Sequence, residues 1–207
     1  MTVIAVDGPA ASGKGTLARR LAVRYGLRHL DTGLLYRAVG WQAERCGVDP
    51  VKVAETLRLE DLADPALRGE AAAQAASRIA AIPAVRQALL KLQRDFGVAP
   101  PGAVLDGRDI GTVVWPDAEV KIFIDAGPEA RAERRHKELL ERGLDSIYSR
   151  VLQDMRERDA RDRGRTVAPL KPAEDALIID SSALDADQVF ARAVDHIGRI
   201  LPSLAPG

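Results

Sequence analysis

The sequence contains no asparagine, a single cysteine, few aromatic residues and no excess of charge of either sign. One cysteine, Cys46, cannot form an internal disulfide, so it fits a reducing compartment and is expected to be a small buried apolar side chain. Thirty basic and thirty acidic residues cancel, and aromatic residues are only 4% of the chain, which disfavours an arginine-rich RNA-binding protein. We therefore expect no nucleic-acid partner, and any anion must be recognised locally.

Long apolar runs are also missing. No stretch approaches the ~18 uninterrupted apolar residues of a membrane span, and the N-terminus enters a strand pattern without a basic segment and cleavage site. We therefore expect no membrane partner and a soluble, cytoplasmic protein. With 207 residues and 46% hydrophobic content, residues 1–207 can bury a full core as one domain.

The chain does contain short apolar runs that alternate with helical patterns. The runs predict strands that are each followed by an aspartate, at residues 3–6, 28–30, 103–105, 120–124 and 176–179. The helical patterns cover residues 16–25, 34–46, 70–81, 85–96, 129–142, 147–161 and 187–201. Strands that are buried on both faces and separated by helices form a parallel sheet with helices on both sides. The sequence therefore predicts an α/β fold with a doubly wound five-stranded parallel sheet, and ligands beyond the carboxyl ends of its strands.

A G-x-x-x-x-G-K spacing follows the first predicted strand and opens an amphipathic helix. In this arrangement backbone amides and the helix N-terminus converge on phosphate, which an ordinary glycine-rich turn does not explain. We expect Lys14 to reach the β and γ phosphates of ATP. The fold is thus predicted to be that of a P-loop NTPase, with ATP bound by Gly8, Pro9, Ala10, Ala11, Ser12, Gly13, Lys14, Gly15 and Thr16.

Glycine occupies position 15, where a serine or threonine that touches magnesium usually follows the lysine. The run G-K-G-T resembles the loop of nucleoside monophosphate kinases, in which Thr16 would help to hold the phosphates. Mg²⁺ would then be held more through water and a distant carboxylate. We expect that carboxylate to be Asp106, acting through water, with Thr16 as a second candidate ligand. The alternative for Asp106 is a loop cap or a charge at a helix N-terminus.

Four further stretches, together with the phosphate loop, resemble bacterial cytidylate kinase. They are "LDTGLLYR" (30–37), "AASRIAAIPAVR" (75–86), "DGRDIGTVVWPDA" (106–118) and "RERDARDRGRTVAPLKPAEDALIIDSS" (156–182). They stand in family order and cover most of the chain. The resemblance implies a monomeric kinase that transfers the γ-phosphoryl group of ATP, with Mg²⁺, to CMP or dCMP.

The same resemblance implies the site residues. Catalytic roles fall on Lys14, Arg108, Arg158 and Arg163. CMP would be bound by Thr32, Tyr36, Arg37, Ser77, Arg86, Arg108, Asp109, Arg158, Asp162 and Arg165. Further candidates near the phosphates are Arg131, Arg134 and Arg161. Other interpretations stay open: Tyr36 as a core-edge residue, Arg37 as a solvated helix arginine, and Ser77 as a small residue packed between helices.

Two segments are expected to act on the acceptor side. Residues from about 48 to 98 form a helical insertion that binds CMP, and residues from about 150 to 168 form a mobile arginine-rich lid. Many members of the family carry a small three-stranded sheet in this insertion, but no alternating strand pattern is present here. A solvated helix pair with i,i+4 ion pairs is the alternative to a lid, but it explains "RERDARDRGR" poorly because Gly164 interrupts the helix among the charges. The three histidines share no metal-ligand spacing, so a structural metal is not expected.

Other functions share parts of this pattern. A kinase for UMP, AMP or a small metabolite shares the loop but does not require the cytosine-site and lid stretches together. A non-catalytic nucleotide switch is the main alternative of another class. Switches that read guanine use an N-K-x-D motif, which a sequence without asparagine cannot contain.

Overall fold

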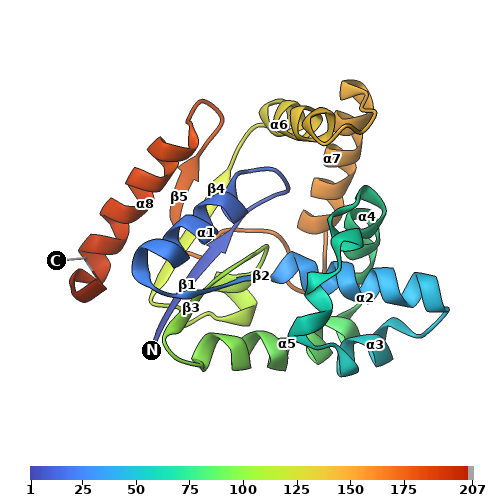
Figure 1. The fold of residues 1–207 in the computed structure, drawn as a ribbon. Coiled ribbons are helices and arrows are strands. Elements are labelled where there is room, and N and C mark those ends of the chain that lie inside the picture. The colour runs from blue at the N-terminus through green and yellow to red at the C-terminus, as the bar shows by residue number, and fades with distance from the viewer. Residues whose placement is uncertain (205–207) are drawn as a thin grey trace.

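The computed structural model of the protein describes residues 1–204. Its strands pair in parallel in the order β2-β3-β1-β4-β5 (Figure 1), which confirms the predicted doubly wound sheet. The strands are β1 (Thr2–Asp7), β2 (Arg28–Asp31), β3 (Gly102–Gly107), β4 (Val120–Asp125) and β5 (Leu177–Asp180).

The predicted helices are present, with ends that move by a few residues. They are α1 (Lys14–Tyr25), α2 (Thr32–Cys46), α4 (Glu70–Ile79), α5 (Pro83–Val98), α6 (Pro128–Glu141), α7 (Tyr148–Arg163) and α8 (Ala186–Ile200). Shorter elements were not predicted individually: α3 (Pro50–Thr56), the 3₁₀ turns η1 (Leu59–Ala63), η2 (Pro65–Arg68) and η4 (Pro202–Leu204), and the π-helical turn η3 (Ile110–Val114). Such short turns carry too few residues for a hydrophobic period to reveal them.

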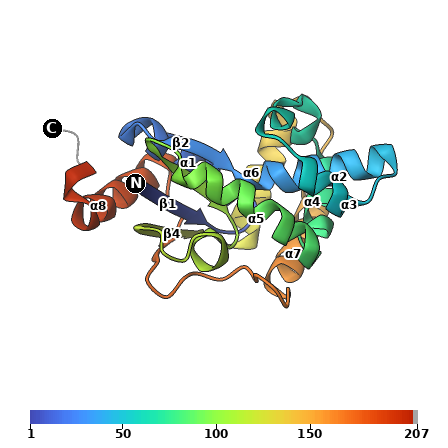
Figure 2. The ribbon, with the colours of Figure 1, turned by 90° about the horizontal axis from the view of Figure 1, so that it is seen from below.

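Alternate residues of the central strand pack into two cores. Val3 and Ala5 of β1 face a core built with α2, α4 and α5, whereas Ile4 and Val6 face a core built with α1 and α8. Figure 2 places α8 at one end of the molecule and α2 to α5 near the other. A sheet that is apolar on both faces explains why the strands are continuous apolar runs.

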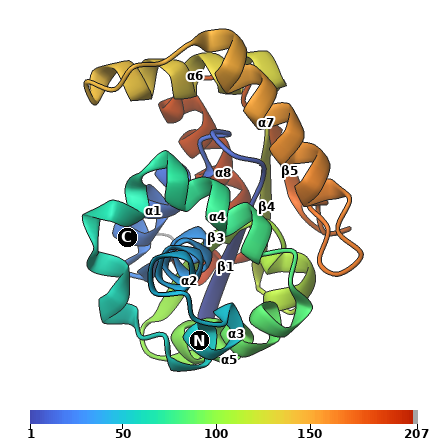
Figure 3. The ribbon, with the colours of Figure 1, turned by 90° about the vertical axis from the view of Figure 1, so that its right-hand side faces the viewer.

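The aspartates that end the strands meet at one edge of the sheet. Asp31 is in register with Asp106, and Asp125 is in register with Asp180. This edge faces the part of the molecule built from α2 to α7, where α6 and α7 form an arch (Figure 3). The predicted ligand-binding edge is therefore the one that the insertion and the arch adjoin.

The insertion between β2 and β3 is helical throughout. Within the described residues 48–98 it consists of α3, η1, η2, α4 and α5 with no strand, as the sequence predicted. One prediction is wrong here: Cys46 is exposed rather than buried. It is the last residue of α2, and Gly47 turns the chain away immediately after it, so its side chain lies at the solvent end of the helix.

Candidate active site

The loop between β1 and α1 adopts backbone conformations that favour glycine. Gly8 has a φ of 152°, and a Cβ at that position would lie 2.1 Å from the Ile124 carbonyl oxygen of β4. Gly13, with a φ of 92°, is the residue from which α1 starts. The two glycines of the motif therefore allow the loop to pack against β4 and to turn into the helix.

Two side chains hold carbonyl groups of this loop. The Ser181 hydroxyl donates to the Ser12 carbonyl oxygen at 2.9 Å, and Arg131 Nη1 donates to the Ala10 carbonyl oxygen at 3.3 Å. Because these carbonyls are directed toward protein donors, the loop amides and the N-terminus of α1 are left to face an anion. Ser181 gives no sequence signal of its own, since it lies at the end of β5 far along the chain.

Lys14 is the first residue of α1 and lies among charges of both signs. Its Nζ is 3.4 Å from the Pro9 carbonyl oxygen. Burial, and then the positive charge of Arg108, lower the pKa of Lys14 to about 7, while Asp106 and Asp31 act in the opposite direction. A bound phosphate would favour the protonated amine, so Lys14 is placed where negative charge would stabilise it.

The two carboxylate oxygens of Asp106, at the end of β3, have different neighbours: one lies at a histidine and the other near the phosphate loop. Its Oδ1 lies 2.7 Å from His29 Nε2, while its Oδ2 lies 3.6 Å from where a Cβ of Gly15 would be. Thr16, in the first turn of α1, is exposed. No role was predicted for His29, because its contact with Asp106 depends on the register of β2 against β3.

The side-chain oxygens near the loop suit magnesium, which needs few protein ligands, better than they suit a metal that is coordinated by protein groups alone. Mg²⁺ in kinase sites usually takes one or two protein oxygens and completes its shell with water and phosphate. The carboxylate of Asp106 and the hydroxyl of Thr16 match that donor set. Among residues 1–204 no group of three or more histidine, cysteine or acidic side chains could hold a metal ion alone.

Three arginines surround Asp162 of α7. Arg108 Nε lies 3.1 Å and Arg158 Nε 3.9 Å from its Oδ2, and Arg165 donates to its Oδ1. Burial alone would raise the pKa of Asp162, but Arg108, Arg165 and Arg158 together lower it below its usual value. Burial, and then repulsion from Arg108, lower the pKa of Arg158 to about 10. One carboxylate thus brings together three of the cations that the sequence assigned to the acceptor.

Of the three residues predicted to read the base, Arg86 and Asp109 contact each other, whereas Ser77 contacts the predicted lid. Arg86 of α5 forms a buried ion pair with Asp109, and its guanidinium carbon lies 5.5 Å from the centroid of the Tyr36 ring. Burial raises the pKa of Asp109, and the charge of Arg86 opposes that rise. Ser77 of α4 accepts a hydrogen bond from Arg161 Nε at 3.3 Å. The hydroxyl of Ser77 is therefore engaged by the predicted lid and is not only packed between helices.

Two further members of the predicted acceptor set, both on α2, donate to main-chain carbonyl groups. The Thr32 hydroxyl donates to the Asp106 carbonyl oxygen at 2.8 Å. Arg37 Nη1 donates to the Leu67 carbonyl oxygen at 2.9 Å, and burial lowers the pKa of Arg37 against the opposing charge of Asp31. The partly buried position of Arg37 argues against an ordinary solvated helix arginine.

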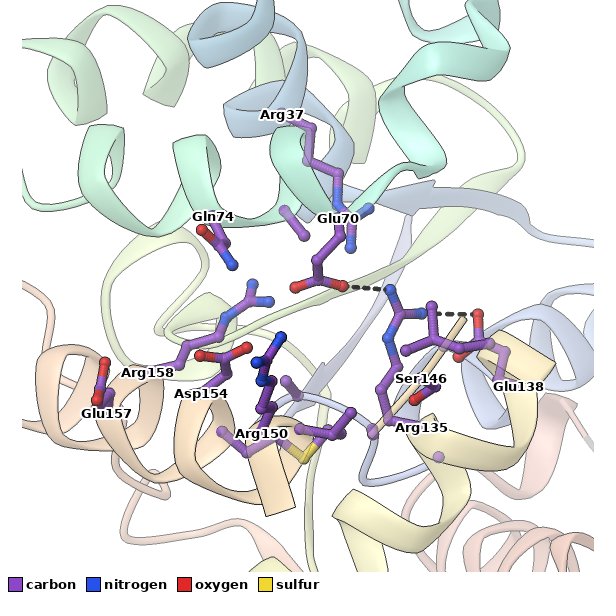
Figure 4. A pocket seen from close by; sticks show the side chains of 18 of the residues that line it. Arg37, Glu70, Gln74, Arg135, Glu138, Ser146, Arg150, Asp154, Glu157 and Arg158 are labelled. Carbon is purple, nitrogen blue, oxygen red and sulfur yellow. Dashed lines mark hydrogen bonds and ion pairs between the residues drawn. The ribbon is translucent and has the colours of Figure 1, made fainter. Parts of the chain in front are cut away.

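A cavity of about 630 Å³ opens between the phosphate loop and helices α2, α4, α6 and α7. Figure 4 shows Arg37 and Glu70 on one side and Arg158 of α7 on the other, with Glu70 joined to Arg135 of α6. The Glu70 to Arg135 contact is 2.6 Å long. Lining residues that the sequence did not single out include Asp31, Glu70, Gln74, Arg135, Arg150 and Asp154. In the sequence, the members of this list that lie on α4, α6 and α7 cannot be told from ordinary polar residues of a helix surface. They come together only because these three helices meet at the cavity.

Some predicted residues lie outside this cavity. Arg163 is 3.7 Å from Asp125 and lines a separate depression of about 510 Å³, together with Arg131. Arg134 lines a third depression of about 350 Å³ beside the loop and α8, whose walls include the apolar side chains of Leu17 and Val189. The predicted acceptor residues form one group around Asp162 and another around Arg86 and Asp109, but of that set only Arg37 and Arg158 line the 630 Å³ cavity, and Arg163 lies apart.

Comparison with known proteins identifies the family. The family model described as cytidylate kinase matches residues 4–199. The chain belongs to the cytidylate kinase family. It is 60% identical to a cytidylate kinase of Paramagnetospirillum magneticum, over 95% of this chain and 98% of that protein. It is also 57% identical to a cytidylate kinase of Xanthobacter autotrophicus, over 93% of this chain and 95% of that protein.

Solved structures with low sequence identity share the fold. An uncharacterized protein from Eubacterium ventriosum has a TM-score of 0.58 at 16% identity, covering 95% of this chain and 98% of its own. A gluconokinase from Sinorhizobium meliloti has a TM-score of 0.52 at 15% identity, covering 98% of this chain and 95% of its own.

Family membership settles the class of protein. Cytidylate kinases are nucleoside monophosphate kinases, so the predicted enzyme class and the predicted ATP-dependent phosphorylation of CMP or dCMP are confirmed. The alternatives of a UMP or AMP kinase and of a non-catalytic switch are not favoured. Across residues 1–204, no helix has the length and apolar character needed to span a membrane.

Proposed function

We propose that Lys14, Arg108, Arg158 and Arg163 carry out the reaction of the cytidylate kinase family in this chain. The γ-phosphoryl group of ATP passes to CMP or dCMP, and the products are ADP with CDP or dCDP. One observation carries the proposal: the phosphate loop lines the 630 Å³ cavity together with Arg37 and Arg158, and Arg158 also belongs to the group of arginines around Asp162. Two polyanions can approach each other only where cations offset their repulsion, and this arrangement supplies those cations.

The donor is held by the loop residues Gly8 to Thr16. Their amides and the N-terminus of α1 face the phosphates, and Lys14 places its charge on the β and γ oxygens. The depression between α1, α8 and Arg134 adjoins the loop and has apolar walls, so it can accept the adenine ring.

Asp106, through water, and Thr16 are the residues that would hold Mg²⁺. When bound, this ion neutralises charge on the β and γ phosphates as the transferring group develops charge. His29 fixes one oxygen of Asp106 and leaves the other toward the loop.

The acceptor is bound by the insertion and the lid. Arg37 and Arg108 hold its phosphate, Ser77, Arg86 and Asp109 read the cytosine edge, and Arg158 and Asp162 contact the sugar. The remaining members of this set, Thr32, Tyr36 and Arg165, lie next to these residues. A donor and acceptor set of this kind distinguishes rings by their hydrogen-bonding edge, because a mismatched ring leaves buried polar groups unpaired.

Residues from about 48 to 98 and from about 150 to 168 are the acceptor-binding insertion and the lid of this scheme. The lid keeps water from attacking the γ-phosphoryl group by completing the cation set only after both substrates are bound. Several of its arginines pair with carboxylates of the protein, as Arg163 does with Asp125 and Arg156 does with Glu129. Arg163 reaches the transferring phosphoryl group only if α7 moves.

A coupled-enzyme assay with a panel of monophosphates at fixed Mg-ATP tests the proposal. We expect CMP and dCMP to be used well, and UMP, AMP and GMP to be used poorly. Arg37→Ala and Arg108→Ala should each reduce turnover, whereas Arg24→Ala, at the far end of α1, should not. Equal use of all monophosphates, or full activity in the Arg108→Ala variant, would contradict it.

The enzyme is further proposed to act as a monomer in the cytoplasm. All the residues assigned to the site come from one chain, and the exposed free thiol of Cys46 suits a reducing compartment. Sedimentation velocity with and without substrates, and fractionation of the source cells, test these two points.

A further inference from the structure

Asp7, the last residue of β1, joins the phosphate loop to the turn that follows the acceptor-site residues. Its side chain is buried, with 5% of its surface exposed. Oδ1 accepts a hydrogen bond from the Ile110 amide at 2.8 Å, and Oδ2 accepts one from the Gly111 amide at 2.8 Å. These amides belong to the first two residues of the π-helical turn η3. Asp7 is also directly followed by Gly8, the first glycine of the loop.

The contact replaces a capping interaction that would otherwise use Asp109. The first amides of a helix have no partner within it, and an aspartate just before the helix usually accepts from one of them. Asp109 is in that position, yet its side chain makes no capping hydrogen bond. The carboxylate of Asp7 takes the amides instead, and the carboxylate of Asp109 is free to pair with Arg86.

The burial of Asp7 has an electrostatic cost that its contacts reduce. Burial raises the pKa of Asp7 to about 7, and the hydrogen bonds from Gly111 and Ile110 lower it. The charge of Asp109 raises the same pKa and that of Arg108 lowers it. An apolar side chain here would leave both buried amides unpaired, so accepting from the two of them offsets the cost of burying the aspartate.

We propose that Asp7 is a positioning residue for acceptor specificity: by capping η3 from the donor side it frees and orients Asp109 for the acceptor base. The inference rests on the proposed function, since it takes the Arg86 and Asp109 pair as the base-reading group. It adds that one carboxylate, that of Asp7, holds the phosphate loop at a fixed distance from the Arg86 and Asp109 pair.

Asp7→Asn is the informative variant, because it keeps the size of the side chain while one oxygen becomes an NH₂ group that cannot accept. Asp109 should then turn toward the vacated amide of η3. Losing one such hydrogen bond corresponds to about tenfold in an equilibrium constant. We expect kcat/KM for CMP to fall by about tenfold and the preference for CMP over UMP to fall by a similar factor. The KM for ATP should change less than about threefold.

Ile4→Val is the matched control. It lies on the same strand, is fully buried, and loses stability without touching η3. Its preference for CMP over UMP should equal that of the parent even if its melting temperature falls. Asp109→Asn should lose the same preference as Asp7→Asn, and the double variant should lose little more than either alone.

Amide hydrogen exchange at Ile110 and Gly111 gives a readout that does not depend on turnover. Exchange at these two amides should be faster in Asp7→Asn than in the parent and unchanged in Ile4→Val. If the parent itself does not prefer CMP, the proposed function fails. If the parent prefers CMP and Asp7→Asn keeps both that preference and the slow exchange, the role of Asp7 is refuted while the proposed function stands.

Discussion

At the scale of single residues, the site is built from charges that are buried next to their partners. Lys14 has a lowered pKa because burial and Arg108 both disfavour its protonated form. Asp162 has a lowered pKa because three arginines outweigh the effect of its burial. Charges that are held in fixed positions before substrate arrives need little rearrangement when it binds, which is the condition for electrostatic catalysis.

Lys14→Met should leave the fold intact and remove most phosphoryl transfer, because no other residue of the loop supplies a cation. The pKa of Lys14 lies below its unfolded value of 10.5, so between pH 7 and 10 the unfolded chain binds more protons than the folded one. The stability contribution of this group therefore rises with pH across that window. Without ligand, the Lys14→Met variant should therefore melt at a higher temperature than the parent at pH 7. This difference in melting temperature should become smaller as the pH rises toward 10. Thermal melting at several pH values with steady-state kinetics measures both effects; a variant with near-parental kcat would contradict the assignment.

Arg86→Ala should harm the use of CMP far more than the use of ATP. Removing one partner of a buried ion pair leaves Asp109 uncompensated, and such losses cost about 3–5 kcal/mol of stability. Without Arg86 the cytosine edge of CMP lacks a hydrogen-bonding partner, which should raise the KM for CMP by roughly ten- to a hundredfold. Apparent KM values for both substrates, with a melting curve to confirm folding at the assay temperature, provide the measurement. Equal losses for ATP and CMP would mean that the pair is structural.

Residue spacing predicted some of these side chains and not others. The loop residues follow one another in the chain, so their spacing alone revealed a phosphate site. His29 and its partner Asp106 are 77 residues apart, and Asp7 and the Ile110 amide are 103 residues apart. Contacts over such separations depend on sheet order and register, which a single sequence without an alignment does not specify.

At the scale of elements, α7 is held to its neighbours by ion pairs rather than by a large apolar face. Arg131 of α6 pairs with Asp159, and Arg156 pairs with Glu129 at 2.6 Å. Met155 is the one apolar side chain of α7 that is buried in the described part of the chain. The Arg156 pair is exposed and contributes little, whereas the Arg131 pair is largely buried, so a movement of α7 would have to give that carboxylate and guanidinium new partners. The charge pattern predicted this helix to within two residues at each end, but it could not predict the contact of Arg161 with Ser77.

Hydrogen exchange over residues 150–168 should report closure of this element. We expect intermediate protection in the free protein, little change with a non-hydrolysable ATP analogue, and clear protection when CMP is added to that analogue. Arg158→Ala and Arg163→Ala should lower kcat more than they weaken ATP binding, because arginines on a transferring phosphoryl group contribute about 10³–10⁵ in rate in related P-loop enzymes. Gln153→Ala is the control on the same helix, because Gln153 is exposed and lines none of the three cavities. Identical protection in all three states would make α7 a solvated charged helix and not a lid.

At the scale of the whole molecule, the two parts proposed to hold the substrates differ in construction. The donor loop is fixed to the central sheet, since a side chain at Gly8 would collide with the backbone of β4. The residues proposed to bind the acceptor belong to α2, α4, α5, α7 and the segments that follow β3 and α7, and α2, α4 and α7 border the cavity. The positions of the strands and helices along the chain were predictable because apolar runs and helical periods are local, whereas the order of the strands in the sheet was not. The size of the cavity was not, because it depends on how far the insertion and α6 stand apart.

Ligands that contact both parts should stabilise the molecule more than either ligand alone. A bisubstrate analogue that joins adenosine and cytidine through a phosphate chain should raise the melting temperature beyond the sum of the shifts given by an ATP analogue and CMP at the same concentrations. Tighter binding to the folded state produces this shift through RT ln(1 + [L]/Kd). Arg37→Ala should reduce the shift from the bisubstrate analogue and from CMP but not the shift from the ATP analogue. Additive shifts in the parent would indicate two sites that do not meet.

The short turns of the insertion have a consequence for how this gene can change. Arg37 is held by the carbonyl group of Leu67, a main-chain atom that every amino acid supplies. The neighbouring residues Glu60, Asp61 and Ala63 are exposed, and η2 is capped by Asp64 at its start. Substitutions along this segment can therefore accumulate without moving the arginine, whereas the loss or gain of one residue between η1 and α4 would shift the carbonyl that holds it. Among enzymes whose insertion also lacks a strand, we therefore expect the sequence of this segment to vary while its length stays constant.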